Sequence, residues 1–248
     1  MTKTKTVLNI PVQALSMSET LDFIKNRIDT NEFTQHVVVN AGKIVSMQKD
    51  EALRQSVLDA DMINADGMSV VWASRFLGRA LPARVAGIDL MLELVKMAHE
   101  QGYKCFFFGA RQEVVEKVVE TFNQEYSPEI IAGFRNGYFN DNEEEQIASE
   151  ISKSGAHMLF VAMSSPKKEI FVNKYKKLMN VPFVMGVGGS FDVVAGITKR
   201  APRWIQKIGL EWFFRFIQEP RRMWRRYLVG NSKFIMLVLK SRFNNGSS

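Results

Sequence analysis

Short apolar runs alternate with segments of helical period along the first 198 residues, and this alternation limits the fold more than any other feature of the sequence. The runs are rich in β-branched and aromatic residues, end near Gly, Asn, Asp or Ser, and predict these strands: TVLNI, HVVVN, MINA, KCFFFG, EIIAGF, HMLFVAM and PFVMGVG. The segments between them place their apolar residues on one side of a helix. Such an alternation predicts an α/β fold with a mainly parallel sheet flanked by helices.

From residue 199 onward the pattern changes to helices without strands, so we expect an α/β core over 1–198 and a helical appendage over 199–248. The appendage has 12 Lys and Arg against two Glu and carries +10 in a chain whose net charge is +7. It also holds Trp204, Trp212 and Trp224. A segment rich in both Arg and Trp favours contact with a polyanion or an anionic membrane surface.

The remaining composition predicts a cytoplasmic protein without a bound metal. The start of the chain lacks the apolar core of a secretory signal, and no segment approaches the roughly 20 apolar residues of a membrane span. His36, His99 and His157 follow no metal-ligand spacing, and Cys105 has no partner motif.

The carboxyl ends of the predicted strands are where a ligand is expected, because ligands of open parallel sheets bind at that edge. The segments that follow the strands there are Asn40, Asp66, Gly109-Ala110, Met163-Ser164-Ser165-Pro166 and Gly186-Val187-Gly188-Gly189-Ser190.

Asp66 lies between two apolar segments, and Asp is among the residues least often buried without a partner. One interpretation is that it caps the helix expected to start at Gly67. The other is that it is a reactive carboxylate displayed at a strand end. Apolar neighbours would raise its pKa, which suits a general base. The two interpretations are compatible, and both stay open at this point.

The glycine-rich segment 186–192, GVGGSFD, follows an apolar strand. Its glycines would allow a phosphate-bearing ligand to approach backbone N–H groups, although a tight turn that needs glycine for packing explains them equally well. The segment is not the G-x-G-x-x-G fingerprint, and no acidic residue follows at the spacing that a ribose contact needs. A nicotinamide dinucleotide is therefore disfavoured.

The arginines at 215, 222 and 225 fall at helical spacings among aromatic residues. A solvated charged face is the ordinary interpretation of such a run. The aromatic residues favour instead contact with phosphate, from a ligand or from a lipid head group. A nucleic-acid-binding protein would use the same Arg and Trp residues, and it is the competing functional class.

A set of short motifs runs in a consistent order from about residue 6 to 235. The motifs are Val39-Asn40-Ala41, Ala65-Asp66-Gly67, Val71-Trp72-Ala73-Ser74, Arg84-Val85-Ala86-Gly87-Ile88-Asp89, Phe108-Gly109-Ala110, Asn136-Gly137-Tyr138-Phe139, Ser165-Pro166-Lys167, Gly186-Val187-Gly188-Gly189-Ser190-Phe191-Asp192, Arg200-Ala201-Pro202, Gly209-Leu210-Glu211-Trp212 and Glu219-Pro220-Arg221-Arg222. In this order they resemble the WecG/TagA/CpsF family of bacterial glycosyltransferases.

The resemblance implies a Rossmann-like core and an appendage that closes over the active site and docks on the membrane. It also implies transfer of a sugar, with inversion, from a UDP-sugar to a polyprenyl-diphosphate-linked saccharide. The reaction would take place at the inner face of the cell membrane during assembly of a surface polysaccharide or teichoic acid. No cofactor or obligatory metal is implied, no nucleic-acid partner is expected, and a homo-oligomer is left open.

The resemblance assigns roles to individual residues. The general base falls on Asp66 with Asn40 beside it, and the arginines for the diphosphate and the membrane fall on Arg215, Arg222 and Arg225. The expected donor-binding residues are Arg84, Gly109, Ala110, Tyr138, Lys168, Gly186, Gly188, Gly189, Ser190 and Asp192. Two positions depart from the family pattern, with Val38 where Thr is usual and Lys168 where Gln is frequent, so the donor sugar is left open.

Overall fold

The computed structural model describes residues 3–218, 220–224 and 229–244. Its centre is a six-stranded sheet in which every neighbouring pair is parallel, in the order β4-β3-β8-β7-β5-β6. The strands are β3 Thr34–Val39, β4 Met62–Ala65, β5 Cys105–Gly109, β6 Ile131–Arg135, β7 Met158–Ala162 and β8 Phe183–Gly186. The predicted α/β fold with a parallel sheet flanked by helices is confirmed.

The first predicted strand is wrong in detail, because TVLNI crosses a turn instead of entering the parallel sheet. Strand β1 (Thr4–Val7) pairs antiparallel with β2 (Ile10–Gln13). Leu8 and Asn9 between them have φ of 49° and 63°. Two consecutive residues with positive φ are what a tight two-residue hairpin turn of the preferred twist requires.

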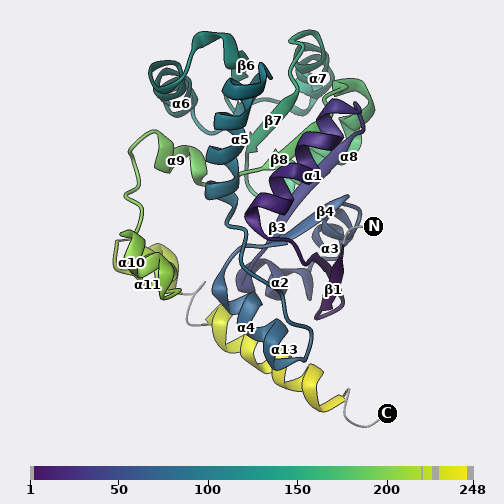
Figure 1. Ribbon diagram of the computed structural model, residues 1–248, viewed down its shortest axis with the longest axis vertical. Helices are drawn as coiled ribbons and strands as arrows, with labels where there is room; N and C mark the ends of the chain where they lie inside the picture. Colours follow the sequence, from purple (N-terminus) through teal and green to yellow (C-terminus); the bar gives the residue numbers. More distant parts are fainter. Residues whose placement is uncertain (1–2, 219, 225–228, 245–248) are drawn as a thin grey trace.

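Helices cover both faces of the sheet (Figure 1). The helices that precede the appendage are α1 Met17–Asp29, α2 Ala41–Met47, α3 Glu51–Leu58, α4 Met68–Phe76, α5 Gly87–Gln101, α6 Gln112–Glu125, α7 Glu144–Lys153, α8 Lys167–Met179 and α9 Ser190–Val194, with short 3₁₀ turns at Pro128–Ile130 and Asp141–Glu143. On one face α1, α5, α6 and α9 bury their apolar residues against alternate strand residues such as Phe107 and Phe160. On the other face two clusters form, one under α7 and α8 and one under α2, α3 and α4.

The appendage contains α10 Arg203–Lys207, α11 Glu211–Gln218, α12 Pro220–Trp224 and α13 Gly230–Asn244. Helix α13 packs against α2, and it lies at the end of the molecule away from α6 and α7 (Figure 1). Its residues Phe234 and Val238 are buried in the same apolar cluster as α2, α3, α4 and the hairpin. The last helix of the appendage therefore shares a core with the residues before 199. The division into two domains stays a prediction.

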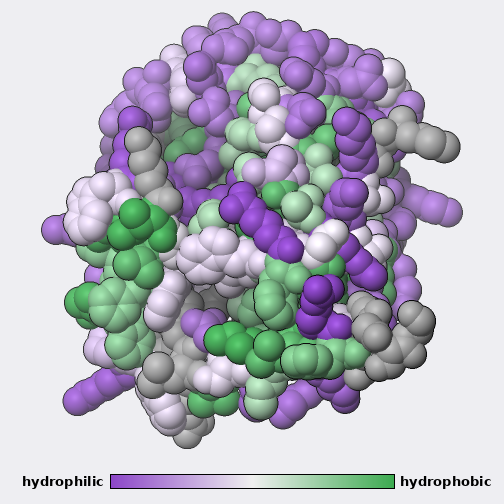
Figure 2. All heavy atoms as spheres, turned by 60° about the horizontal axis from the view of Figure 1, so that its bottom comes forward, coloured by the Kyte–Doolittle hydropathy of each residue, from purple (hydrophilic) through white to green (hydrophobic). Residues whose placement is uncertain are grey.

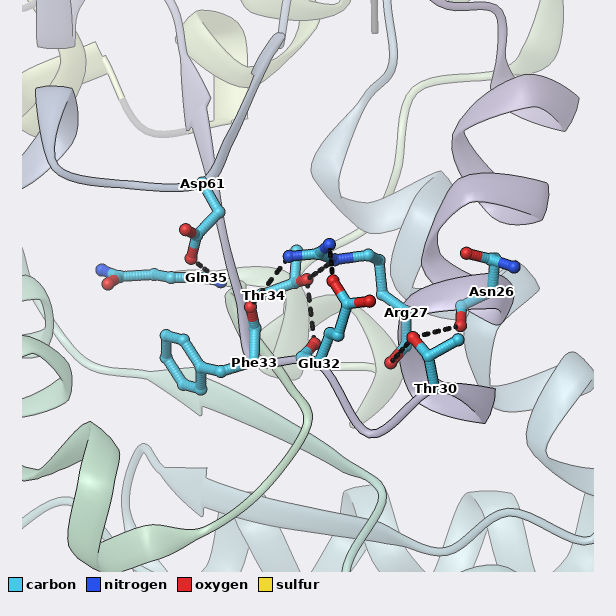
Figure 3. Close-up of polar contacts among 8 residues, drawn as sticks. All are labelled: Asn26, Arg27, Thr30, Glu32, Phe33, Thr34, Gln35 and Asp61. Carbon is cyan, nitrogen blue, oxygen red and sulfur yellow. Dashed lines mark hydrogen bonds and ion pairs between the residues drawn. The ribbon is translucent and has the colours of Figure 1, made fainter. Parts of the chain in front are cut away.

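The amino end of β3 is fixed by side chains from α1 and from the residue before β4 (Figure 3). Arg27 on α1 donates from Nε to Thr34 Oγ1 at 2.9 Å and forms an ion pair with Glu32. Asp61 accepts the backbone N–H of Gln35 at 2.8 Å. These contacts hold β3 and β4 in their register, which in turn decides what stands at their carboxyl ends.

Candidate active site

Asp66 and Asn40 lie side by side at the carboxyl edge of the sheet, because β3 and β4 are parallel neighbours that end at the same level. Val39 pairs with Ala65, and the backbone N–H of Asp66 donates to Val39 O at 2.8 Å. Asp66 is partly buried and so is Asn40. The edge rule for parallel sheets thus places the two predicted catalytic residues on adjacent strands.

Asp66 does not cap the helix that follows it. The N-cap of α4 is Gly67, with φ of 126° and no side chain to accept a hydrogen bond. The backbone N–H of Gly87, the first residue of α5, instead acts on the carboxylate of Asp66 and lowers its pKa. Such an N–H has no partner within its own helix. The interpretation that Asp66 caps the helix that follows it is therefore wrong.

Burial is the largest influence on Asp66 and raises its pKa, and the nearby carboxylate of Glu211 raises it further. The Gly87 N–H and the positive charges of Arg84 and Lys43 act in the opposite direction but do not cancel the rise. A carboxylate with a raised pKa holds a transferred proton more firmly, and this is the property that a general base needs near neutral pH.

Glu211 is the first residue of α11 and brings a second carboxylate from the appendage to this edge. Its Oε2 lies 3.0 Å from Arg84 Nη1, and its Oε1 lies 3.5 Å from Arg200 Nε. Arg200 also lies 2.7 Å from Asp89 on α5. Two carboxylates and two arginines therefore join the appendage to the core beside Asp66.

The turn before α11 is packed closely enough to explain why Glu211 reaches this position. Gly209 has φ of 76°, and a Cβ there would lie 2.9 Å from Met68 Cγ and 3.2 Å from Trp72 Cη2 on α4. The backbone of the turn therefore rests directly on α4, and only glycine fits without displacing these side chains.

Asn40 is the N-cap of α2, where its Oδ1 accepts the backbone N–H of Lys43 at 3.0 Å. The side chain of Lys43 places Nζ 3.0 Å from Glu169 Oε1 on α8. Asn40 is thus connected through Lys43 to a second group of charges.

That group consists of Lys43, Lys168, Glu169 and Ser165; the two lysine side chains and the carboxylate are nearly buried, and Ser165 is exposed. Lys168 Nζ lies 3.2 Å from Glu169 Oε1 and 2.6 Å from Ser165 Oγ, and Ser165 Oγ lies 2.9 Å from Glu169 Oε1. Burial, with some repulsion from Lys43, lowers the pKa of Lys168 to about 8. Burial alone would raise the pKa of Glu169, but the two lysines and the hydrogen bonds together lower it.

Lys168 lies directly over the end of β8, since a Cβ on Gly186 would come within 2.6 Å of Lys168 Cε. Both residues line a small pocket with Val38, Lys43 and Glu169. The methyl groups of Val38 themselves lie on the α5 side, 3.7 Å from where a Cβ on Gly87 would stand. The side chains of the two departures from the family pattern, Val38 and Lys168, therefore lie on opposite faces of the sheet.

Gly109 and Ala110 form a packed corner at the ends of β5 and β7. A Cβ on Gly109 would lie 2.4 Å from Ala162 O, and Ala110 has φ of 56° and donates its N–H to the same oxygen at 2.9 Å. Gly137 donates its N–H to Ala110 O at 2.8 Å. Tyr138, which follows, is exposed. The motif glycines thus have a packing role here, and the donor-binding role of Gly109, Ala110 and Tyr138 stays a prediction.

The turn 186–190 behaves similarly. Gly188 has φ of 53° with open space around it, and Gly189 is the N-cap of α9. Ser190 is buried and donates its hydroxyl to Val187 O at 2.8 Å. The backbone oxygen of Asp192 accepts the N–H groups of Ile197 and Thr198. The donor-binding role of these residues also stays a prediction.

The three predicted appendage arginines are described to different extents. Arg215 belongs to α11 and Arg222 to α12, but only their backbones are among the described atoms. Arg225 lies outside the described residues.

Sequence reasoning missed Lys43, Glu169 and Glu211 as members of this site. Glu211 stood within a quoted motif, Gly209-Leu210-Glu211-Trp212, but nothing in the motif indicates an ion pair with Arg84, 127 positions earlier. Lys43 and Glu169 are separated by 126 positions and lie on helices that only the fold brings together. Their one local signal is that Lys43 stands in the first helical turn after Asn40.

A partly shielded carboxylate at the carboxyl edge of a parallel sheet, surrounded by basic side chains, is suited to a group-transfer enzyme. Comparison with known proteins makes the class specific, because the sequence model named "Glycosyl transferase WecG/TagA/CpsF family" matches residues 5–248. The protein is a glycosyltransferase. It belongs to the WecG/TagA/CpsF family, which confirms the resemblance drawn from the order of the motifs.

Two curated relatives are similar to this chain. The N-acetylglucosaminyldiphosphoundecaprenol N-acetyl-beta-D-mannosaminyltransferase of Bacillus subtilis (strain 168) is 34% identical over 243 residues, which cover 98% of this chain and 93% of the relative. The protein of the same name from Bacillus spizizenii is 38% identical over 181 residues, which cover 73% of this chain and 69% of the relative. Among the described residues, no helix is both long and apolar enough to cross a bilayer.

Proposed function

We propose that this glycosyltransferase moves a sugar from a UDP-sugar to a polyprenyl-diphosphate-linked saccharide at the inner face of the cell membrane. The product is an intermediate of a bacterial surface polysaccharide or teichoic acid. Family membership supports the proposal, and so do the names of the two relatives, which describe transfer of an N-acetylmannosaminyl group to an undecaprenol-diphosphate acceptor.

Asp66 is the general base of the proposed reaction. The observation that carries this assignment is a partly exposed carboxylate at the sheet edge whose pKa burial and Glu211 both raise. The acceptor hydroxyl oxygen attacks the anomeric carbon while its proton passes to Asp66. The bond between the anomeric carbon and the UDP oxygen breaks, and UDP leaves with that electron pair, so the anomeric configuration inverts. Asn40, on the adjacent strand end, is placed to orient the acceptor or the sugar.

The departing diphosphate needs positive charge or oriented N–H groups. Arg84 lies at the edge beside Asp66, with its side chain 17% exposed. Its guanidinium presents the forked donors that match phosphate oxygens. Arg215 and Arg222 on α11 and α12, and Arg225 after them, are the further candidates, and the N–H groups of the 186–190 turn complete the proposed diphosphate contacts.

The appendage also supplies the proposed membrane contact. Apolar side chains gather on its surface and on the adjoining α4, whereas the opposite part of the molecule is mostly hydrophilic in this view (Figure 2). The exposed apolar residues of this surface include Trp72, Phe76, Trp204, Ile208, Trp212, Phe213, Ile217, Ile235, Met236 and Phe243. Together with the excess of Lys and Arg, such a surface suits an interface with anionic lipid.

The decisive test is transfer by Asp66→Asn, assayed with UDP-N-acetylhexosamine donors and a polyprenyl-diphosphate-linked N-acetylglucosamine analogue. Loss of a general base lowers turnover by roughly 100- to 10,000-fold, and UDP binding measured by calorimetry stays close to that of the wild type. Asp59→Asn, at an exposed carboxylate after α3, is the matched control. Undiminished turnover in Asp66→Asn would remove the base assignment, and a wild-type chain that uses no UDP-sugar would remove the proposed donor class.

A further inference from the structure

The nearly buried charges of Lys43, Lys168 and Glu169, joined by the exposed Ser165, are more positive than negative. Both lysine ammonium groups pair with the same carboxylate oxygen, Glu169 Oε1, at 3.0 Å and 3.2 Å. Their side chains are only 12% and 10% exposed, and the carboxylate is 1% exposed. The other carboxylate oxygen, Glu169 Oε2, has no hydrogen-bond partner among the described residues. One buried carboxylate therefore pairs with two ammonium groups, and the three side chains together have a net charge of one positive unit.

Such an excess is unfavourable unless something compensates for it, because a charge removed from water needs a partner of opposite sign. Burial is the largest cause of the lowered pKa of Lys168, and the charges that act on it are Lys43 and Glu169, with no second carboxylate among them. The missing counter-charge is consistent with a site that binds an anionic ligand.

The position of the group agrees with a ligand site. Lys168 lies over Gly186 at the carboxyl end of β8, and Lys43 shares the first turn of α2 with Asn40. The pocket formed by Lys43, Lys168 and Glu169 reaches Val38, the next-to-last residue of β3, and Gly186, the last residue of the neighbouring β8. The positive charge is thus at the same sheet edge as Asp66 and Asn40, and not at an unrelated surface.

We propose that Lys168 Nζ, backed by Lys43 and held in place by Glu169 and Ser165, binds an anionic oxygen group of the donor. This inference rests on the proposed function and narrows its substrate class. Two parts of a donor carry such oxygens: the diphosphate, and the carboxylate of a hexuronic acid. In either case the ligand group supplies the missing negative charge, and a charge-assisted hydrogen bond from the ammonium holds it.

The test is calorimetric titration of the full chain with UDP, UDP-N-acetylglucosamine and UDP-glucuronic acid, in the wild type and in Lys168→Gln. Lys177→Gln, an exposed lysine on the same helix, is the control with the same change of charge. A loss of tenfold or more confined to UDP-glucuronic acid assigns the sugar carboxylate. An equal loss for all three ligands assigns the diphosphate. Affinities that stay within twofold of those of Lys177→Gln for every ligand overturn the proposal.

Loss of binding in Lys168→Gln would not be due to unfolding, because the variant keeps the ion pair between Lys43 and Glu169. We therefore expect its melting temperature to be at or above that of the wild type. Lys43→Gln is a second variant that leaves Lys168 paired with Glu169, and it should weaken binding of the same ligand. Unchanged binding in Lys168→Gln, with clear UDP binding by the wild type, counts against the subsite alone. A wild type that binds none of the three ligands counts against the donor class and the subsite together.

Discussion

Glu211 of α11 lies 3.0 Å from Arg84, with its Oε2 facing Arg84 Nη1, and this ion pair joins the appendage to the core beside Asp66. The same carboxylate raises the pKa of Asp66. A residue that belongs to the appendage by sequence therefore adjusts the acid–base property of the proposed base.

Glu211→Gln should move the acidic limb of the pH profile of kcat/KM to lower pH. Removing the neighbouring negative charge lowers the pKa of Asp66, so its carboxylate stays ionised further into acid. Burial, the larger cause, is unchanged, and the pKa stays above its ordinary value. Glu93→Gln, at an exposed position on α5, is the control. An acidic limb at the wild-type position in Glu211→Gln would show that the appendage does not influence the base.

Lys168→Gln should change how stability depends on pH. Burial lowers the pKa of Lys168 from 10.5 to about 8 in the folded protein, so the protonated side chain destabilises the folded state. This destabilisation is complete below pH 8 and becomes smaller as the pH rises toward 10.5. The advantage of the variant in free energy of unfolding is then about 3 kcal/mol near pH 7 and shrinks toward pH 10.5. Of the titratable groups around it, Glu169, whose pKa is lowered, stays ionised through this window, and His36, with a pKa of about 4, is neutral.

Urea unfolding of wild type, Lys168→Gln and Lys177→Gln at pH 7 and pH 9.5 measures this effect. The prediction would be contradicted if the difference in free energy of unfolding between Lys168→Gln and the wild type were the same at pH 7 and pH 9.5.

Phe234→Ala should destabilise the whole protein, although Phe234 belongs to the appendage. Its side chain is 4% exposed in the cluster that also contains α2 and β4 residues. Removing a buried Phe costs about 3–5 kcal/mol in free energy of unfolding. Phe243→Ala on the same helix, at a side chain that is 71% exposed, should change it by less than about 0.5 kcal/mol. Urea unfolding of both variants measures the contrast, and equal stabilities would show that α13 adds nothing to the core.

Replacing Trp204 and Ile208 together with Ala should weaken sedimentation with anionic vesicles. These side chains are exposed on and next to α10, and each contributes up to about 1.5–3 kcal/mol if it enters lipid, so affinity falls roughly tenfold or more. Phe134→Ala, at an exposed apolar residue on edge strand β6, should bind as the wild type does. Raising the salt concentration should weaken the remaining binding of the variant to the vesicles, because salt screens the attraction of Lys and Arg to anionic lipid.

The sequence was sufficient for the parallel sheet and for the residues at its carboxyl edge, because both follow from local periodicity and from one rule about where strands end. It was insufficient where a contact joins distant segments. The backbone N–H that lowers the pKa of Asp66 belongs to Gly87 and not to the next helix, since the chain between them returns α5 to the end of β4. Lys43 and Glu169 meet only because β3 and β8 are neighbours in the sheet.

The hairpin shows a different limit. TVLNI has a β-rich composition, but two residues in the middle of it take positive φ, and nothing in their side chains demands this. The preference of a two-residue turn for this backbone conformation decided the outcome.

Helix α13 has a buried side and an exposed side, and this determines the distance between the proposed catalytic edge of the sheet and a membrane that contacts the helix. One side buries Phe234 and Val238 in the cluster that includes α2, and the other exposes Ile235, Met236 and Phe243. Helix α2 begins at the residue after Asn40. Packed helices are separated by about 8–10 Å, so a bilayer in contact with the outer side of α13 would have its head groups only one helix layer from α2. A lipid-borne acceptor would then present its sugar while its tail stays dissolved among other lipids, without extraction into water.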